Sequence, residues 1–217
     1  MPIDESRPFQ PVRIALLTVS DTRTLADDSS GDILAARIAD AGHELAAREI
    51  SRDSKNEIAA HLHRWIDDEM VDCVITTGGT GLTGRDITPE ALDRVKDKDI
   101  PGFGELFRWL SYETIGVSTI QSRACAVLAR GTYIFALPGS NGAVKDGWDK
   151  ILLHQFDSRF RPCNFVELMP RRPAGWNWPK TTGRCSRGYA DGDQRKPPVQ
   201  TCPYRAADRI RHAHTSR

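Results

Sequence analysis

Apolar runs alternate with segments of helical periodicity along most of this 217-residue chain. Residues 12–19 (VRIALLTV) and 71–77 (VDCVITT) are nearly continuous apolar runs, as expected of strands that are covered on both faces. Residues 43–50 (HELAAREI) form a weaker strand-like segment between them. Because helical segments separate these strands, the sequence predicts an α/β fold with a mostly parallel sheet.

Helix start signals support this alternation. Ser29 and Asp32 resemble a helix N-terminus, and Ser54 with Glu57 forms a capping box. Pro89 stands where a proline opens a helix at little cost, because its missing N–H would have no partner there. These signals predict helices that begin near residues 29, 54 and 88.

The later part of the chain is less regular. Residues 101–116 have the apolar spacing of a helix, and residues 138–156 read as a turn followed by a final helix. Residues 124–137 (ACAVLARGTYIFAL) fit either two short strands or a helix end followed by one strand. Both alternatives add at least one strand to the sheet.

Polar or glycine-rich residues follow every predicted strand. In open parallel sheets, ligands bind outside the carboxyl ends of the strands, so we expect these exits to converge on one site with several acids and backbone N–H groups. The residues concerned are Ser20 and Asp21, Asp53, residues 78–86, and the turn of Pro138, Gly139 and Ser140.

The glycine-rich exit, residues 78–86, superficially matches two known motifs. Residues 79–84 (GTGLTG) fit the dinucleotide pattern G-x-G-x-x-G, but Pro89 delays the helix, and Glu105, about 20 residues beyond, does not close a strand. A P-loop would need lysine and a hydroxyl where Arg85 and Asp86 stand. We therefore reject both motifs.

An extended glycine loop with free N–H groups nevertheless suits phosphate oxygens. Asp53 and Asp86 at neighbouring exits are candidates for holding Mg²⁺, which takes one or two carboxylates plus substrate phosphates. Arg85 either offsets phosphate charge or is simply exposed. The alternative roles are a helix-start residue for Asp53 and a turn former for Asp86.

Composition predicts a cytoplasmic protein without membrane association. No apolar run approaches the roughly 18 residues of a membrane span, and the first residues, with acids and prolines, do not resemble a signal peptide. The five cysteines form no CxxC pair, so a zinc or redox framework is not expected. Cys73 and Cys125 lie in apolar runs and are interpreted as small core residues.

Charge and composition divide the chain into three parts. Residues 171–217 contain 11 Lys and Arg against 3 Asp and Glu, with few large apolar residues, so we expect a disordered basic tail over residues 170–217. We expect a flexible N-terminal arm over residues 1–10 and one folded domain over residues 11–169. The tail is either an extension without a role or a nucleic-acid-binding segment.

Four segments together resemble a known family. They are TTGGTGLTGRDITPEAL, PGFGELFRWLSYETIG, STIQSRA and IFALPGS, in this order and spacing. The chain resembles the molybdenum cofactor biosynthesis protein B family (MoaB/Mog) over roughly residues 10–168. The resemblance implies a three-layer αβα fold with a mostly parallel sheet, a homo-oligomer (trimer or hexamer) and binding of molybdopterin.

In its active members the resemblance also implies adenylylation of the terminal phosphate of molybdopterin by Mg-ATP, ahead of molybdate insertion. The two acids that matter there fall on Asp53 and Asp86, which we interpret as catalytic residues that position Mg²⁺. The implied pocket lining is Ser20, Asp21, Thr77, Gly78, Gly79, Thr80, Gly81, Glu105, Ser122, Pro138, Gly139 and Ser140.

Two further hypotheses stay open at this level. The chain could be a pterin-binding carrier or assembly partner of the same pathway without catalysis. It could instead bind nucleic acid through its basic tail, although the family resemblance predicts molybdopterin and other cofactor-synthesis proteins as partners and no nucleic acid.

Overall fold

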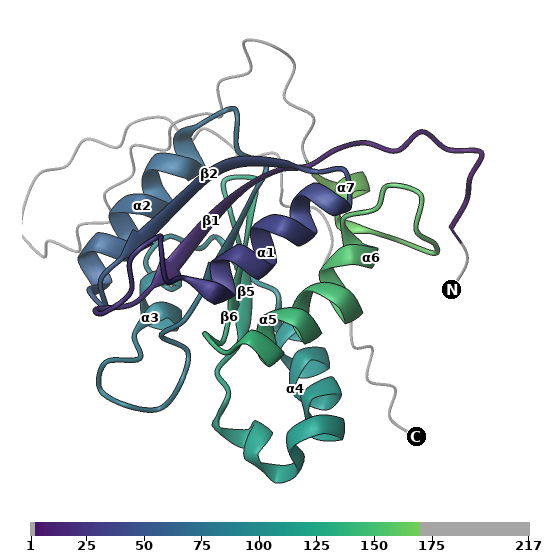
Figure 1. The fold of residues 1–217 in the computed structure, drawn as a ribbon. Coiled ribbons are helices and arrows are strands. Elements are labelled where there is room, and N and C mark those ends of the chain that lie inside the picture. The colour runs from purple at the N-terminus through teal and green to yellow at the C-terminus, as the bar shows by residue number, and fades with distance from the viewer. Residues whose placement is uncertain (1–2, 170–217) are drawn as a thin grey trace, which may run out of the picture. The chain divides into compact units, whose positions relative to one another are not determined.

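The computed structural model describes residues 3–169. In this part of the chain a six-stranded sheet lies between two layers of helices (Figure 1). The strands are β1 (Arg13–Val19), β2 (Glu44–Ser51), β3 (Cys73–Thr77), β4 (Lys98–Asp99), β5 (Cys125–Ala129) and β6 (Thr132–Leu137). The helices are α1 (Ser29–Asp40), α2 (Lys55–Asp67), α3 (Thr88–Leu92), α4 (Pro101–Ile115), α5 (Asn141–Gly147), α6 (Leu153–Gln155) and α7 (Phe165–Leu168).

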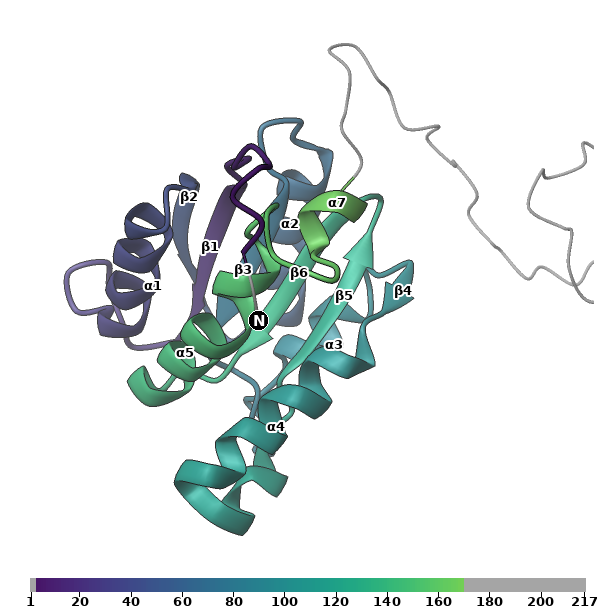
Figure 2. The same ribbon diagram turned by 90° about the vertical axis from the view of Figure 1, so that its right-hand side faces the viewer.

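The sheet has the order β2-β1-β3-β6-β5-β4, and Figure 2 shows the strands next to one another in this order. The four strands β2, β1, β3 and β6 run parallel, whereas β5 is antiparallel to both β6 and β4. This arrangement confirms the predicted α/β fold with a mostly parallel sheet. It also means that four strands end at the same edge.

Side chains of the central strands alternate between two buried clusters, because successive residues of a strand point to opposite faces. Ile14 and Leu16 of β1 pack with α1, α4 and the α5–α6 segment, while Leu17 packs with α2 and α3 on the other face. The continuous apolar sequence of β1 follows from this double coverage. The three-layer arrangement is therefore confirmed.

Residues 124–137, for which the sequence left two alternatives, form the two strands β5 and β6. They are joined by a two-residue turn in which Arg130 and Gly131 both have positive φ, at 48° and 89°. Two central residues with positive φ are typical of the type I′ hairpin turn, whose twist matches that of the strands it joins. The helix-end alternative is excluded.

One helix start and the form of one helix differ from expectation. Asp28, and not Ser29, caps α1, and its carboxylate accepts a 3.0 Å hydrogen bond from the Gly31 N–H. The helix predicted after residue 140 widens into a π-helical segment, η2 (Trp148–Leu152), between α5 and α6. Trp148, Ile151 and Leu152 are all buried there, so the wider turn directs three large side chains into the core.

The described part of the N-terminal segment is attached to the domain. Ile3 forms an antiparallel bridge with Phe160, and the Arg7 guanidinium donates to the Ser158 carbonyl at 3.0 Å. The sequence led us to expect a flexible arm here; the contacts come from residues 157–167, far away in the chain, and could not be anticipated locally. The predicted basic tail, residues 170–217, lies outside the described residues.

The helices of the described part are all too short or too polar to cross a membrane. Cys73 is fully buried in β3, and Cys125 is partly buried against the core, in line with the predicted packing role of both residues.

Candidate functional site

The carboxyl ends of β1, β2, β3 and β6 lie side by side, so the predicted strand exits meet. The Ser20 N–H donates to the Ser51 carbonyl at 2.9 Å, which joins the exits of β1 and β2. The Gly78 N–H donates to the Leu137 carbonyl at 2.9 Å, and the Thr77 hydroxyl donates to the Pro138 carbonyl at 3.2 Å. One continuous edge therefore carries Ser20, Asp21, Asp53, the glycine loop and the Pro138–Ser140 turn.

Three carboxylates gather at this edge. Asp21 Oδ1 accepts the backbone N–H of Asp53 at 3.0 Å, and its other oxygen forms an ion pair with Arg85. Asp86 Oδ2 accepts the N–H of Thr83 at 2.9 Å and the hydroxyl of Thr83 at 2.6 Å. The Asp53 carboxylate accepts a hydrogen bond from the Asp21 backbone.

These environments shift the pKa values of Asp53 and Asp86 in opposite directions. Burial raises the pKa of Asp53 above its ordinary value, and the negative charges of Asp21 and Asp86 add to this, while Arg85 opposes it. The hydrogen bond from the Thr83 hydroxyl lowers the pKa of Asp86. Asp53 is thus the acid whose ionised form this environment disfavours, and a cation at this edge would stabilise it.

Close packing requires the first glycines of the loop. Gly78 has φ +104°, and a Cβ there would lie 2.3 Å from the Val19 carbonyl oxygen. Gly79 has φ +64°, and its Cβ would lie 2.4 Å from Thr88 Oγ1 and 3.3 Å from Asp53 Oδ1. Only glycine fits both positions without strain. The backbone of Gly79 is therefore held directly beside the Asp53 carboxylate.

The last glycine of the G-x-G-x-x-G pattern has no such role. A Cβ on Gly84 would meet no atom within 4 Å, and this residue lies in an exposed turn, not in a helix packed on a strand. A dinucleotide fingerprint needs its third glycine for close helix–strand packing. The geometry therefore agrees with the rejection of this motif from the sequence.

Arg123 and Glu90, which the sequence analysis did not select, hold the glycine loop. The Arg123 N–H donates to the Thr80 carbonyl at 2.9 Å, and its Nε donates to the Gly81 carbonyl at 2.7 Å. Its guanidinium also forms an ion pair with Glu90 of α3. Arg123 stands in the segment STIQSRA that carried the family resemblance, but no local pattern indicated its contact with a loop forty residues earlier.

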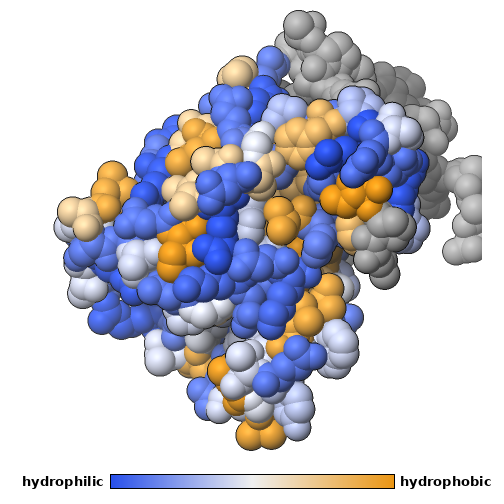
Figure 3. Space-filling view, turned by 45° about the vertical axis from the view of Figure 1, so that its right-hand side comes forward, coloured by the Kyte–Doolittle hydropathy of each residue, from blue (hydrophilic) through white to orange (hydrophobic). Residues whose placement is uncertain are grey.

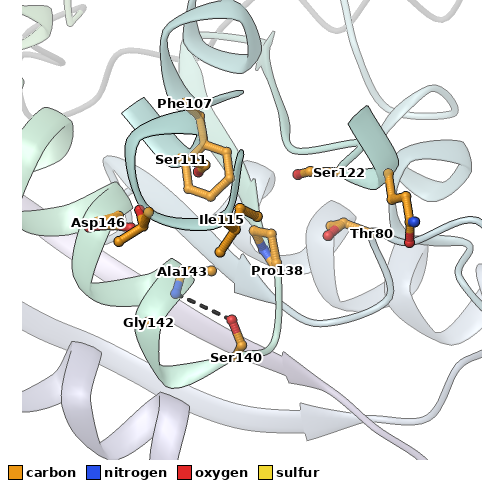
Figure 4. Close-up of a pocket in the computed structure, with 13 residues that line it drawn as sticks. Thr80, Phe107, Ser111, Ile115, Ser122, Pro138, Ser140, Gly142, Ala143 and Asp146 are labelled. Atoms are coloured by element: carbon orange, nitrogen blue, oxygen red, sulfur yellow. Dashed lines mark hydrogen bonds between the residues drawn. The ribbon is translucent and has the colours of Figure 1, made fainter. Parts of the chain in front are cut away.

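A cavity of about 290 Å³ adjoins the glycine loop on the side of α4 and α5 (Figure 4). Five residues of the predicted pocket line it: Thr80, Gly81, Ser122, Pro138 and Ser140. The sequence analysis missed the other lining residues, which are Phe107, Ser111, Thr114, Ile115, Gln121, Gly142, Ala143 and Asp146. Asp146 is the only charged side chain among the residues that line this cavity.

Glu105, in contrast, lies away from this cavity. It lines a second depression of about 520 Å³ together with Pro89, Arg108 and Arg123. Successive helix residues are about 100° apart, so Glu105 and Phe107 of α4 lie on nearly opposite sides of that helix. Ser122 is common to both hollows. The predicted pocket residues therefore fall on two sides of α4.

A metal ion would not find a complete set of protein ligands here. In residues 3–169 no group of three or more His, Cys, Asp and Glu side chains is arranged to hold one. Asp53 and Asp86 alone would leave most coordination positions to water or to substrate oxygens, which is the usual manner of Mg²⁺. The two acids therefore fit a cation that arrives with a phosphate and do not fit a resident structural metal.

Comparison with known proteins supports the family resemblance. Residues 15–158 match a family model described as a probable molybdopterin binding domain. Molybdenum cofactor biosynthesis protein B of Escherichia coli (strain K12) is 48% identical over 160 residues, which are 74% of this chain and 94% of that protein.

Solved structures agree. A crystal structure of molybdenum cofactor biosynthesis protein B matches with a TM-score of 0.66 at 42% identity, covering 68% of this chain and 92% of that one. The tungsten cofactor synthesizing protein MoaB from Pyrococcus furiosus matches with a TM-score of 0.60 at 36% identity, covering 66% and 91%. With the family model matched over residues 15–158, these similarities show that the chain belongs to the molybdenum cofactor biosynthesis protein B (MoaB/Mog) family of probable molybdopterin binding domains.

Proposed function

We propose that this protein acts in molybdenum cofactor biosynthesis, where it binds molybdopterin and adenylylates its terminal phosphate with Mg-ATP. The observation that carries the proposal is the strand-end edge, at which the partly buried Asp53 carboxylate, Asp86 and the backbone of Gly78 and Gly79 lie together. The names of the E. coli relative and of the matched family support the choice of pathway and ligand.

The reaction asks for positioning and not for covalent catalysis. A terminal phosphate oxygen of molybdopterin forms a bond to the α-phosphorus of ATP, the bond between that phosphorus and the β-bridging oxygen breaks, and pyrophosphate leaves. A phosphate monoester is already anionic near neutral pH, so no protein base is needed. What the protein must supply is alignment of two phosphates and stabilisation of their charge.

The residues of the edge are suited to these tasks. Asp53 and Asp86 would hold Mg²⁺, which supplies positive charge to the reacting phosphates. The glycine loop approaches without side chains, so its N–H groups would donate to phosphate oxygens. Arg85 is paired with Asp21 at the strand-end edge, and its side chain is 69% exposed. Its guanidinium would therefore add positive charge where a phosphate approaches this edge.

The cavity beside the loop suits the pterin ring. Phe107, Ile115 and Pro138 provide apolar walls, as Figure 4 shows, while Ser122 and Thr80 lie at the end nearest the glycine loop. A flat ring in this cavity would present its phosphate-bearing side to the loop. Asp146, at the other end, is placed to accept hydrogen bonds from the amino-substituted pyrimidinone edge of a pterin.

The decisive experiment is incubation of the purified protein with molybdopterin and Mg-ATP, followed by mass-spectrometric detection of adenylylated product. Asp53→Asn and Asp86→Asn should each lose turnover while retaining pterin binding, because neither change enters the ring cavity. Asp40→Asn, an exposed acid at the end of α1, is the matched control and should turn over normally. Wild-type rates in either site variant would show that its assigned role is wrong.

The second candidate function is a molybdopterin carrier without catalysis. The ring cavity favours it equally, because binding alone does not need the acids. The same incubation separates the two: tight pterin binding with no product over many hours would identify a carrier.

We also propose that the protein is a homo-oligomer, a trimer or a hexamer. Figure 3 shows apolar side chains among polar ones at the projecting end of α4 and η1 (Gly116–Gln121). They include Trp109 at 65% exposure, Val117 at 77% and Ile120 at 80%. Several large apolar side chains exposed at one end of a domain are typical of a contact surface. Light scattering should give three or six times the chain mass, and Val117→Asp should reduce it.

A further inference from the structure

Arg123 contacts the glycine loop at two places, through its backbone N–H and its side chain. Its backbone N–H donates to the Thr80 carbonyl at 2.9 Å, and its Nε donates to the Gly81 carbonyl at 2.7 Å. Its Nη2 donates to the carbonyl of Asp86, on the far side of the intervening turn. Three contacts therefore fix the loop immediately before and after the segment that leads to the Asp86 carboxylate.

The other tethers of this loop are at its base or at its exposed tip. At the base, the Thr88 N–H donates to the Gly79 carbonyl at 2.9 Å, and its hydroxyl donates to the Gly78 carbonyl at 2.8 Å. At the tip, Arg85 reaches Asp21 with a largely exposed side chain, which is a weak restraint. Within the loop, the Asp86 carboxylate accepts from Thr83, and Arg123 adds contacts to its carbonyls from another segment of the described chain.

Glu90 in turn orients Arg123. It is paired with the guanidinium through both carboxylate oxygens, and the hydrogen bond from Arg123 lowers the pKa of Glu90. A planar guanidinium that is held on one edge by a carboxylate presents its remaining N–H groups in a fixed direction. Here those groups point to two backbone carbonyls. Lysine would keep the charge of Arg123 and lose this geometry.

We propose that Arg123 is a positioning residue that, with Glu90, holds Gly81 and Asp86 in the arrangement that phosphate and Mg²⁺ require; this rests on the proposed function. The two loop ends are tightly linked, because a Cβ on Gly81 would lie 2.8 Å from Asp86 Oδ2. Release of either carbonyl would thus move the carboxylate. The pterin cavity, whose walls come mostly from α4 and α5, would keep its shape.

The test compares Arg123→Lys, Glu90→Gln and the double variant with Arg94→Lys, an arginine whose contact is Asn56 on an exposed surface. Adenylyl transfer gives kcat and KM, and hydrogen exchange reports on residues 79–87. Arg123→Lys should lower kcat by up to about 100-fold, the scale expected from a misplacement of about 1 Å. Its KM for molybdopterin should stay within about threefold because the ring cavity is intact, and exchange across the loop should accelerate.

The fold-decrease in kcat of the double variant should be smaller than the product of the decreases in the two single variants, because Arg123 and Glu90 act as one unit. Arg94→Lys should match the wild type in every measurement. Urea unfolding midpoints are measured alongside, so that a general loss of stability is separated from loop displacement. Unchanged exchange in Arg123→Lys, or faster exchange with unchanged kcat, would overturn the positioning role.

Absence of transfer in the wild type would instead remove the proposed function and leave this inference testable. Mg²⁺ with inorganic pyrophosphate then serves as the probe, with calorimetry and loop exchange as the measurements. The wild type and Arg94→Lys should gain protection across residues 79–87, whereas Arg123→Lys should not. Equal protection, or none, in all three proteins would refute the role of Arg123.

Discussion

Gly79 offers the most direct test of how the loop is held. Alanine there must adopt φ +64°, and its Cβ would lie 2.4 Å from Thr88 Oγ1. The left-handed conformation costs a non-glycine residue about 1–2 kcal/mol, and forcing extra volume into a packed site costs typically about 1–3 kcal/mol. The less flexible unfolded chain of the alanine variant returns about 0.4–1 kcal/mol. We therefore expect Gly79→Ala to lower the free energy of unfolding by about 1–5 kcal/mol.

Gly84→Ala is the matched control, five residues along the same loop. A Cβ there would meet nothing within 4 Å, so the free energy of unfolding should not fall and should rise by up to about 1 kcal/mol. Urea unfolding of both variants, followed by circular dichroism at equal protein concentration, measures the difference. If the two variants unfold at the same urea concentration, Gly79 is not confined as the structure indicates, and the steric reasoning fails.

Three further predictions concern single side chains. Burial lowers the pKa of His43 from its usual 6.5, so the unfolded chain takes up a proton first as the pH falls. The free energy of unfolding should therefore decline below pH 6.5 by up to about 1.4 kcal/mol per pH unit. In urea titrations, His43→Gln should flatten that slope, whereas the exposed control His63→Gln should not. Asp28→Ala removes a fully buried carboxylate that accepts from the Thr18 hydroxyl at 2.7 Å and pairs with Arg48. Calorimetry should therefore show that the free energy of unfolding falls by about 3–5 kcal/mol, and by less in Asp28→Asn. Asp146→Asn should weaken binding of a fluorescent pterin by about tenfold and leave ATP binding unchanged, since an amide accepts only one of two adjacent donor groups well; equal loss for both ligands would contradict the ring placement.

Much of the domain could be predicted because its signals are local. The apolar run of β1 indicates a strand covered on both faces, and the Ser54 capping box marks the start of α2, where its hydroxyl does accept from the Glu57 N–H. The convergence of the acids at one edge also followed from the sequence, because parallel strands share a direction. Asp21, Asp53 and the glycine loop are accordingly found together.

Other features depend on how distant elements pack. Asp28, and not the predicted Ser29, caps α1, and its carboxylate also accepts a hydrogen bond from Thr18 of β1. A local capping motif does not contain this second contact. Glu105 lies in a separate depression because of the rotation of α4 about its own axis. That rotation is set by the burial of Phe103 and Phe107 against the sheet.

The sequence by itself therefore determined the alternation of strands and helices up to α4 and the edge at which Asp53 and Asp86 would be found. These follow from periodicity, capping and strand direction, which act over a few residues. The family followed separately, from the resemblance of four sequence segments. Only the tertiary structure decided which side chains hold that edge and which line the cavity beside it. Arg123 reaches Gly81 and Asp86 only because η1 and the start of β5 return beside the loop, and such a contact, set by the packing of α4, has no local signature.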